Sequence, residues 1–368
     1  MKTLGRIALA LASLIIALTP CVAVQDEPVR IGVAGLTHGH VGWILGREQQ
    51  DDIQVVGIFE PNRQLAEQYS KRFGFPMQLV YGNLEEMLEE VKPEAVTAFN
   101  SIYEHLAVVE ACAPRGIHVM VEKPLAVSME HARKMSELAR AHGIHLLTNY
   151  ETTWYASTEE AYRRVHIERE IGEIRKIVVH DGHSGPKEIG VGPEFLAWLT
   201  DPGMNGGGAS IDFGCYGANL ITWLMKGEKP TSVTAVFQQM KPEIYAEVDD
   251  EATILITYPR TQGIIQASWN WPFSRKDLEV YGQTGYVNTR DSKRMRIRLK
   301  GATSEEEIEA HHSEGAYRDP FSFLAAVVRG KHTVAATDLS ALDTNVTVVQ
   351  ILEAARISAS QGKTVLLK

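Results

Sequence analysis

From about residue 29 to residue 150, short apolar runs rich in β-branched side chains alternate with segments whose apolar residues recur every three or four positions. The first pattern is typical of buried β-strands and the second of amphipathic helices. Because the two alternate along the chain, we predict a parallel sheet with helices on both faces. The predicted strands cover residues 29–34, 53–59, 94–99, 117–121 and 144–147.

After residue 150 the apolar runs follow one another with few helical segments between them, and several alternate between apolar and polar residues. This pattern is typical of an antiparallel sheet. We therefore predict an α/β nucleotide-binding type of domain over residues 28–150 and an α+β domain with a large, mostly antiparallel sheet over residues 151–368. The predicted strands are 174–180, 231–239, 251–259, 263–271, 278–282 and 294–300, and further helices are expected at about 211–225, 321–328 and 339–360.

The N-terminal segment differs from the rest of the chain. Two basic residues precede an uncharged apolar run over residues 7–18, and small residues follow at 21–23. This order is typical of a secretory signal peptide, and the run is too short for a good membrane span. We predict a signal peptide over residues 1–23 and a protein exported to the periplasm or another extracytoplasmic space. Lipidation of Cys21, which Pro20 fits poorly, and an uncleaved N-terminal anchor are the alternatives.

Composition narrows the choice of function. The formal net charge is −9 and the sequence contains no long basic block, so it lacks the electrostatic footprint of a nucleic-acid-binding protein. The hydrophobic content of 44% is enough for a sizeable core. Three cysteines are too few for a disulfide framework. We therefore expect a protein that acts on small molecules.

The first predicted strand runs into the turn Gly35-Leu-Thr-His-Gly-His. In a dinucleotide-binding βαβ unit, the sequence G-x-G-x-x-G at this place lets the backbone approach the pyrophosphate. Here Gly35 has the first place, whereas Thr37 and His40 replace the other two glycines. Glu60 ends the second strand, where a carboxylate can bind the adenosine ribose hydroxyls. Because a carboxylate repels a 2′-phosphate, we expect NAD rather than NADP.

The histidines of this turn allow other interpretations. His38 and His40 could bind a metal ion, but the sequence shows no further ligands nearby, and we predict no metal site. They could also be polar residues of an exposed turn without a role in binding. Another class of dehydrogenase uses the pattern G-x-x-x-G-x-G, whose spacing Gly35, Gly39 and Gly42 approximate. That class also needs a catalytic Y-x-x-x-K, which is absent from the chain.

Three residues at or near the ends of predicted strands and helices are candidates for a role in catalysis. Lys123 follows the fourth strand of the first domain, so it should point into the crevice where parallel sheets bind ligands. Beside a cationic oxidised nicotinamide its pKa should fall, which would help it to stabilise an alkoxide. If Asp212 begins the predicted helix 211–225, Tyr216 shares its face. A nearby cation could stabilise the ionised tyrosine for proton exchange with a carbinol. A charged turn, a helix cap and a packed aromatic are the structural alternatives.

Together, VRIGVAG, EKPLAVS, GGGASIDFGCYG and SQGKTVLL resemble the Gfo/Idh/MocA oxidoreductases, a family of sugar and polyol dehydrogenases and their relatives. The resemblance covers nearly all of the chain after residue 28. It implies a Rossmann-type nucleotide-binding domain, then an open-faced antiparallel sheet often used for oligomerisation. It also implies that the C-terminal segment, about residues 320–368, packs back towards the first domain.

The resemblance also implies roles for individual residues. Lys123 matches the active-site lysine of the family, Asp212 its substrate-side aspartate and Tyr216 its acid/base residue, a position where many members carry histidine. The Tyr form is closer to the glucose-fructose oxidoreductase and dihydrodiol dehydrogenase branches. Asn100 and Ser101 stand where the family has Thr/Asn-Pro, so the loss of proline makes the local backbone differ from the family pattern. The predicted cofactor-binding residues are Gly35, Thr37, His38, Gly39, His40, Glu60, Asn100, Ser101, His105, Glu122 and Lys123.

Substrate contacts are expected from an aromatic ring and polar groups early in the second domain, namely Trp154, His183 and Lys187, although each could equally belong to the core or surface. Trp269 and Trp271 are interpreted as sheet packing or an oligomer interface.

The leading functional prediction is an exported NAD(P)-dependent oxidoreductase acting on a sugar or polyol carbinol. Because an exported enzyme meets no dependable pool of free nicotinamide nucleotide, we expect a tightly bound NAD that is recycled within each catalytic cycle. One alternative is a redox-neutral glycosidase or epimerase that acts through a keto-sugar. Another is a non-catalytic exported sugar-binding protein. The expected partners are a small-molecule sugar or polyol and further copies of the chain, with no nucleic acid and no stable membrane insertion.

Overall fold

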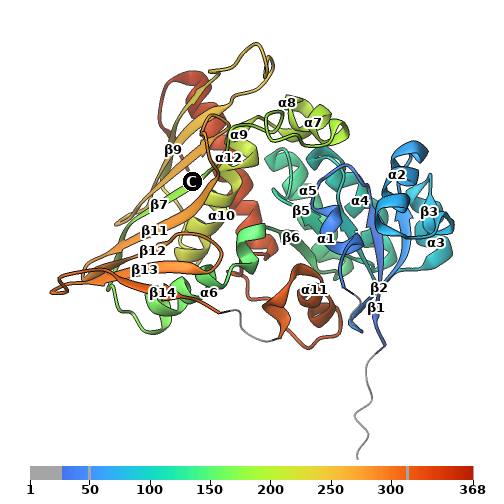
Figure 1. Ribbon diagram of the computed structural model, residues 1–368, viewed down its shortest axis with the longest axis horizontal. Coiled ribbons are helices and arrows are strands. Elements are labelled where there is room, and N and C mark those ends of the chain that lie inside the picture. Colours follow the sequence, from blue (N-terminus) through green and yellow to red (C-terminus); the bar gives the residue numbers. More distant parts are fainter. Residues whose placement is uncertain (1–26, 49–50, 312–314, 368) are drawn as a thin grey trace, which may run out of the picture.

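The computed structural model describes residues 27–48, 51–311 and 315–367. These residues form two sheets with helices between and around them (Figure 1). The first sheet has the strand order β3-β2-β1-β4-β5-β6, and its pairings are all parallel, as predicted. Its strands are β1 (Val29–Ala34), β2 (Ile53–Phe59), β3 (Val80–Tyr81), β4 (Ala95–Ala98), β5 (His118–Glu122) and β6 (Leu146–Asn149).

Helices connect the strands of the first sheet, and three of them begin where a side chain caps the first turn. The side chains of Asn62, Asn83 and Ser128 accept hydrogen bonds from first-turn backbone N–H groups, which is how N-caps stabilise a helix. The strand order reverses between β1 and β4, so their carboxyl ends border the crevice where such sheets bind ligands. The helices are α1 (Val41–Leu45), α2 (Arg63–Phe73), α3 (Leu84–Val91), α4 (His105–Cys112) and α5 (Met129–His142).

The second sheet has nine strands in the order β14-β13-β12-β11-β7-β10-β9-β8-β15. Only the pairing of β10 with β7 is parallel, so the predicted mostly antiparallel sheet is confirmed. Some of the short strands, β12 and β14 among them, were not predicted from the sequence. The strands are β7 (Ile174–Gly182), β8 (Ser232–Gln238), β9 (Glu251–Thr257), β10 (Gln262–Ser268), β11 (Arg275–Gly282), β12 (Gly285–Thr289), β13 (Arg294–Leu299), β14 (Glu306–Glu309) and β15 (Val365–Leu366).

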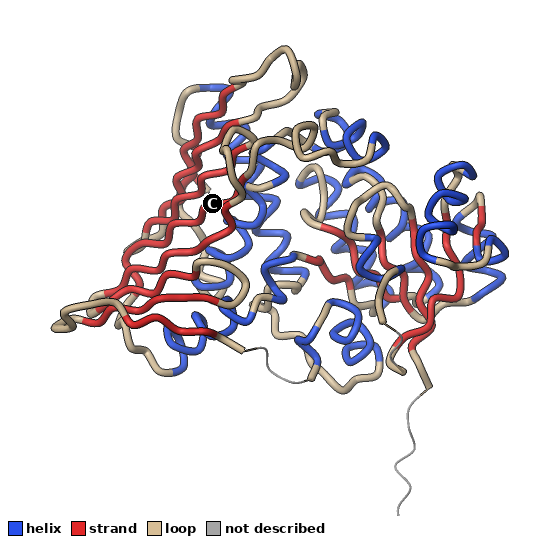
Figure 2. The backbone as a smooth tube through the Cα atoms, in the orientation of Figure 1, coloured by secondary structure: helices blue, strands red, loops and turns tan. Residues whose placement is uncertain are grey.

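Helices cover one face of the second sheet and leave the other face open (Figure 2). α10 and α12 lie on the covered face, between the two sheets (Figure 1). The single helix predicted over residues 211–225 was wrong in one respect: it is interrupted at Phe213, and Asp212 ends α9 instead of beginning a helix. The helices of this part are α6 (Ala156–Tyr162), α7 (Pro193–Leu199), α8 (Pro202–Asn205), α9 (Ala209–Asp212), α10 (Gly214–Leu224), α11 (Pro320–Val328) and α12 (Leu342–Gln361).

The C-terminal segment contacts both sheets. Phe321, Phe323 and Leu324 of α11 are buried in the same hydrophobic cluster as Val29 and Ile31 of β1. α12 packs on α10 and β8 of the second domain and on α5 of the first. Apolar side chains of both domains are buried against these helices, and this burial stabilises the placement of one domain relative to the other. Burial contributes about 25 cal/mol per Å² of apolar surface.

The predicted signal peptide and Cys21 lie outside the described residues. Among the residues that the structure describes, no helix has both the length and the hydrophobicity that a membrane crossing requires.

Candidate functional site

A buried ion pair joins the two domains at the carboxyl edge of the first sheet. Lys123 follows β5 and Asp212 ends α9, and they are 5% and 6% exposed. Lys123 Nζ lies 2.5 Å from Asp212 Oδ1 and 3.1 Å from the Asp212 carbonyl oxygen. The indole N–H of Trp269 donates to Asp212 Oδ2 at 3.1 Å. The carboxylate is therefore held from both sides, and it fixes the lysine at the mouth of the crevice.

The ion pair determines the charge of both partners. Burial disfavours the Lys123 ammonium, but attraction to Asp212, the hydrogen bond with it, and the neighbouring Cys215 and Glu122 together raise the pKa of Lys123 above its ordinary value. Burial alone would raise the pKa of Asp212, but the Lys123 ammonium lowers it. The lowered lysine pKa expected from the sequence refers to a bound cationic nicotinamide and stays a prediction, but the aspartate in direct contact, which the sequence did not reveal, acts in the opposite direction.

Tyr216 of α10 lies beside the pair and is 2% exposed. Lys123 Nζ is 5.2 Å from its ring centroid, and Lys276 Nζ of β11 is 4.1 Å away. Despite these two cations, burial and the negative charges of Glu151 and Asp181 raise the pKa of Tyr216 well above its ordinary value. The ionised tyrosine considered from the sequence is therefore disfavoured, and the neutral phenol is the form that faces this site.

The turn after β1 packs tightly on the end of β4. Gly35 has φ +83°, and a Cβ there would come within 2.7 Å of Asn100 Cβ, so glycine is required. Glu60 accepts the backbone N–H groups of Leu36 at 2.9 Å and Asn62 at 2.8 Å. Its buried carboxylate stands at the end of β2, where it disfavours a 2′-phosphate.

Helix α7 of the second domain covers this turn. The Thr37 hydroxyl donates to the Phe99 carbonyl at 3.3 Å and accepts from the Trp198 indole N–H at 3.1 Å. The rings of Phe195 and Trp198 lie 4.7 Å and 5.9 Å from the ring of His38. Donation of the Thr37 hydroxyl to a pyrophosphate remains a prediction, and it requires that Thr37 exchange its bond to Phe99.

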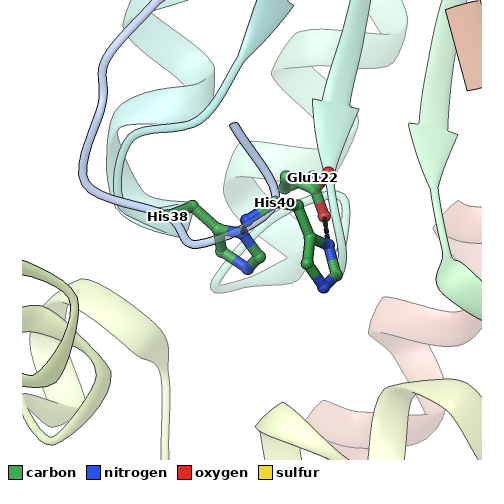
Figure 3. A group of neighbouring side chains, drawn as sticks. All are labelled: His38, His40 and Glu122. Carbon is green, nitrogen blue, oxygen red and sulfur yellow. Dashed lines mark hydrogen bonds and ion pairs between the residues drawn. The ribbon is translucent and has the colours of Figure 1, made fainter. Parts of the chain in front are cut away.

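His38 and His40 project side by side from this turn, and Glu122 approaches His40 from the end of β5 (Figure 3). His40 Nδ1 lies 3.0 Å from Glu122 Oε2, and the His40 ring stacks on Trp43 with centroids 3.8 Å apart. Burial opposes ionisation of Glu122, but His40, His38 and the hydrogen bond from Asn149 lower its pKa to about 2. The expectation that no further ligand lies near the two histidines was wrong, because β5 brings Glu122 within 4.8 Å.

The hydrogen bonds of this cluster nevertheless fit a metal ion poorly. His38 Nδ1 accepts the backbone N–H of His40 at 3.1 Å, which places the proton of neutral His38 on Nε2. Burial and the neighbouring His40 lower the pKa of His38, so the neutral form prevails. A nitrogen that binds a metal must be unprotonated. Each Glu122 oxygen also accepts a hydrogen bond, one from Asn149 at 2.6 Å and one from His40, so a metal ion would have to share the carboxylate with these donors.

We therefore expect the purified protein to contain no stoichiometric zinc, manganese or iron, and we expect a chelator to leave its thermal unfolding temperature unchanged. Elemental analysis after dialysis, together with calorimetry with and without chelator, checks this expectation. One equivalent of metal that disappears in a His40→Ala variant would contradict it.

The other predicted cofactor residues lie close to the turn but differ in exposure. Asn100 is 7% exposed and packs against Gly35. The Ser101 hydroxyl donates to Glu104 at 2.6 Å and caps the following turn. His105 is fully buried, its Nδ1 lies 3.2 Å from the Leu125 carbonyl, and burial lowers its pKa to about 4. In this position, His105 supports the loop after Lys123 and does not face the crevice directly.

The three predicted substrate residues lie in different environments. Trp154 is 8% exposed, packs among core residues with Phe323, and donates to Asn149 at 2.8 Å. His183 is partly buried and stacks edge-on against Phe213, which directly follows Asp212. Lys187 is exposed, its backbone N–H donates to the Tyr245 hydroxyl, and its carbonyl accepts the N–H of Gly190. Of the three, His183 is the one that lies beside the ion pair.

Sequence reasoning missed a polar cavity that reaches Lys276, the neighbour of the Tyr216 ring. The cavity has a volume of about 850 Å³, and Glu151, Asp181, His183 and Lys276 line it. It also missed the bond of Trp269 to Asp212, since this tryptophan was assigned to packing. The charged residues Asp181 and Lys276 on inward-facing strand positions were a usable signal, because such positions are normally apolar.

Two family models match the chain. The first, described as the oxidoreductase family with an NAD-binding Rossmann fold, covers residues 29–150. The second, described as the GFO/IDH/MocA C-terminal domain, covers residues 160–288. Trans-1,2-dihydrobenzene-1,2-diol dehydrogenase of Sus scrofa is 26% identical over 236 residues, which are 64% of this chain and 65% of that protein. The Xenopus laevis enzyme of the same name is 28% identical over 184 residues, 50% of this chain and 52% of that protein. The chain thus spans less than two thirds of the length of these relatives.

Solved structures share the fold. An aldose-aldose oxidoreductase from Caulobacter crescentus complexed with glycerol has a TM-score of 0.76 at 19% identity, over 92% of this chain and 100% of that chain. An inositol dehydrogenase homolog from Azotobacter vinelandii complexed with NAD+ has a TM-score of 0.78 at 20% identity, over 93% and 98% of the two chains. The first domain, which carries Lys123 of the lysine–aspartate pair, thus matches the oxidoreductase family with an NAD-binding Rossmann fold. The chain belongs to the Gfo/Idh/MocA family.

The residues around the turn fit NAD. His38 Nε2 and Asn100 Oδ1 are buried and have no hydrogen-bond partner among the described residues, so they can bind a polar group that enters there. A Cβ at Gly39 would meet nothing within 4 Å, which leaves room beside the backbone. Residues 35–40 and Asn100 would hold the phosphate side of NAD, and Glu60 would hold the adenosine ribose.

Proposed function

We propose that the protein is an NAD-dependent oxidoreductase that acts on a carbinol of a sugar or polyol. The observation that carries this proposal is the buried Lys123–Asp212 pair, which lies beside Tyr216 at the carboxyl edge of the NAD-binding sheet. The polar cavity of about 850 Å³, which reaches Lys276, has room for a hydroxylated ring. The relatives named for diol, aldose and inositol chemistry support the same substrate class.

In the proposed reaction, each residue around the ion pair has a different role. NAD, when bound, supplies the acceptor for the hydride of the carbinol carbon. Lys123 stays positively charged because Asp212 raises its pKa, so it donates to the carbinol oxygen and stabilises the negative charge that develops there. Asp212 stays ionised and can accept a substrate hydroxyl. Tyr216, neutral because of its raised pKa, donates its proton to the oxygen when a carbonyl is reduced. In the oxidation of a carbinol the proton would return along the same path to the phenolate, which Lys123 and Lys276 face.

We further propose that the protein is exported and holds NAD tightly through repeated turnovers. The apolar segment at residues 7–18 supports export. An exported enzyme must regenerate its cofactor, either with a second carbonyl substrate or by returning the hydride to the oxidised sugar. The second route would give redox-neutral epimerisation or glycosidic cleavage.

Mass spectrometry of the nucleotide released by denaturing the purified mature protein tests the proposal. We expect about one equivalent of NAD or NADH per chain. A protein that releases no nucleotide and does not bind added NAD would contradict the enzyme proposal, and a non-catalytic sugar-binding protein would then be the better interpretation.

Light scattering of the same preparation tests a second proposal, that copies of the chain associate through the open face of the nine-stranded sheet. Val236 and Tyr281 of this sheet, which alternate with the buried Ala235 and Val280, are 62% and 38% exposed, which supports such an interface.

A further inference from the structure

A second pocket adjoins the polar cavity, and aromatic side chains line it. This space, the aromatic pocket, has a volume of about 360 Å³ and is lined by Trp43, Trp154, Tyr155 and Phe321 together with several polar residues. Tyr155, Glu151 and Ser292 line both spaces, so the polar cavity and the aromatic pocket meet at these residues. A ligand larger than one ring can therefore occupy both spaces at once.

Two walls of the aromatic pocket are fixed by contacts that need no ligand. One face of the Trp43 indole stacks on His40, with ring centroids 3.8 Å apart, and His40 Nδ1 lies 3.0 Å from Glu122 Oε2 (Figure 3). Asn149 donates to the other Glu122 oxygen at 2.6 Å and accepts the Trp154 indole N–H at 2.8 Å. The two tryptophans are therefore joined to each other through the Glu122 carboxylate.

The same contacts fix the aromatic pocket relative to the ion pair, because Glu122 directly precedes Lys123. A third wall is held by Arg47, which donates to Asp319, the N-cap of α11, at 2.8 Å. The Arg47 guanidinium also lies 5.8 Å from the ring centroid of Phe321. The pocket is thus preformed, and a rigid ring can enter it at a small cost in conformational entropy.

The side chains of the aromatic pocket fit a sugar ring. One face of a pyranose consists largely of C–H groups, which pack on flat aromatic side chains, whereas its hydroxyls need polar partners at the edge. Trp43 and Tyr155 are only partly buried and line the space. Glu151, Ser292 and Asp319 offer polar groups around it. A ring without hydroxyls would take water from these groups and return no hydrogen bond.

We propose that the aromatic pocket binds a second sugar ring, joined by a glycosidic bond to the ring whose carbinol faces Lys123 and Tyr216. This inference rests on the proposed function, and it names the substrate class as disaccharides or longer oligosaccharides rather than free monosaccharides or small polyols. The second ring stacks on Trp43 and Tyr155, and the glycosidic bond lies where the two spaces meet. Binding of the second ring holds the first one in place against Lys123.

Calorimetric titration of the purified mature protein tests the second ring without requiring turnover. The probes are glucose with cellobiose and maltose, mannose with mannobiose, and N-acetylglucosamine with chitobiose. We expect at least one disaccharide to bind about tenfold more tightly than its monosaccharide, as for one added ring stacked on aromatic side chains. Trp43→Ala should lose this preference and keep the affinity for the monosaccharide, whereas Trp43→Phe, which retains an aromatic face, should keep most of it.

Trp223→Ala is the matched control. Trp223 is also partly buried and stacked on a ring, that of Tyr162 with centroids 4.5 Å apart, but it lines neither space. This variant should retain the preference for the disaccharide.

Oxidation of tryptophans by N-bromosuccinimide, followed by peptide mass spectrometry, locates the second ring in the wild-type protein, so the test stands even if Trp43→Ala does not fold. The preferred disaccharide should slow the oxidation of Trp43, whereas the monosaccharide should not. Trp223 should react at the same rate in both samples and thus controls for consumption of the reagent by the sugar.

A wild-type protein that prefers no disaccharide of the panel, a preference that is unchanged in Trp43→Ala, or oxidation of Trp43 that the bound disaccharide does not slow would overturn the inference. The proposed function can fail separately. Turnover of inositol by a protein without a disaccharide preference would support the proposed function and overturn only this inference. A disaccharide preference that depends on Trp43, in a protein that turns over no sugar or polyol, would refute only the proposed function.

Discussion

Lys123→Met is expected to lower kcat by at least about 10² to 10³-fold, the usual cost of removing a group that stabilises a developing oxyanion. The same change should reduce the free energy of unfolding by about 3–5 kcal/mol, because it leaves the Asp212 carboxylate buried without its counter-ion. Asp212 is 6% exposed, and without Lys123 its carboxylate would keep the hydrogen bond from the indole N–H of Trp269 but no longer have a cation in contact. Steady-state kinetics on polyols and thermal unfolding measure the two effects separately.

The double variant Lys123→Met with Asp212→Asn distinguishes the chemical role from the structural one. Removing both charges leaves neither unpaired, so much of the lost stability should return. Turnover should not return, because the cation that stabilises the carbinol oxygen is still absent. Recovery of both stability and turnover in the double variant would show that Lys123 acts only as a counter-ion. A wild-type protein that binds sugars but has no turnover for Lys123→Met to abolish would favour the binding-protein alternative.

The sequence predicts the fold well because the pattern of apolar residues along the chain differs between the two domains. Alternating strands and helices before residue 150 and consecutive strands after it define the two sheets. Strand β14 (Glu306–Glu309) could not be predicted in the same way, because it consists of charged residues around a single isoleucine. The break at Phe213 was also missed, since the apolar spacing continues through it.

The site was predicted in part, and the missing parts have one cause. Lys123, Asp212 and Tyr216 stand in recognisable local sequences, and the structure brings them together. Asp181 and Lys276 meet only through the register of β7 with β11, which the sequence alone does not specify. The effect of Asp212 on the pKa of Lys123 was missed for the same reason, because it depends on a contact between residues far apart in the chain.

Gly208→Ala is expected to cause the largest loss of stability among single conservative changes near the site. A Cβ at Gly208 would lie 1.8 Å from the Asp249 carbonyl oxygen, which accepts the backbone N–H of Ala209 at 2.9 Å. The Asp249 side chain also binds Gly208 N–H at 3.1 Å and Ser210 N–H at 2.7 Å, so the backbone cannot move aside without losing these bonds. We expect a loss of at least about 3 kcal/mol, measured as a fall of roughly 5–10 °C in the unfolding temperature.

The same variant should also lose turnover, because α9 begins at the next residue and ends at Asp212, so a displaced start of this helix moves the carboxylate away from Lys123. Gly82→Ala is the matched control: a Cβ there meets nothing within 4 Å, so neither its unfolding temperature nor its turnover should change. If Gly208→Ala unfolds like the wild-type protein, the close approach of the 208 and 249 backbones is not what positions Asp212. If it unfolds early but keeps full turnover, the carboxylate is positioned by Trp269 and Lys123 alone.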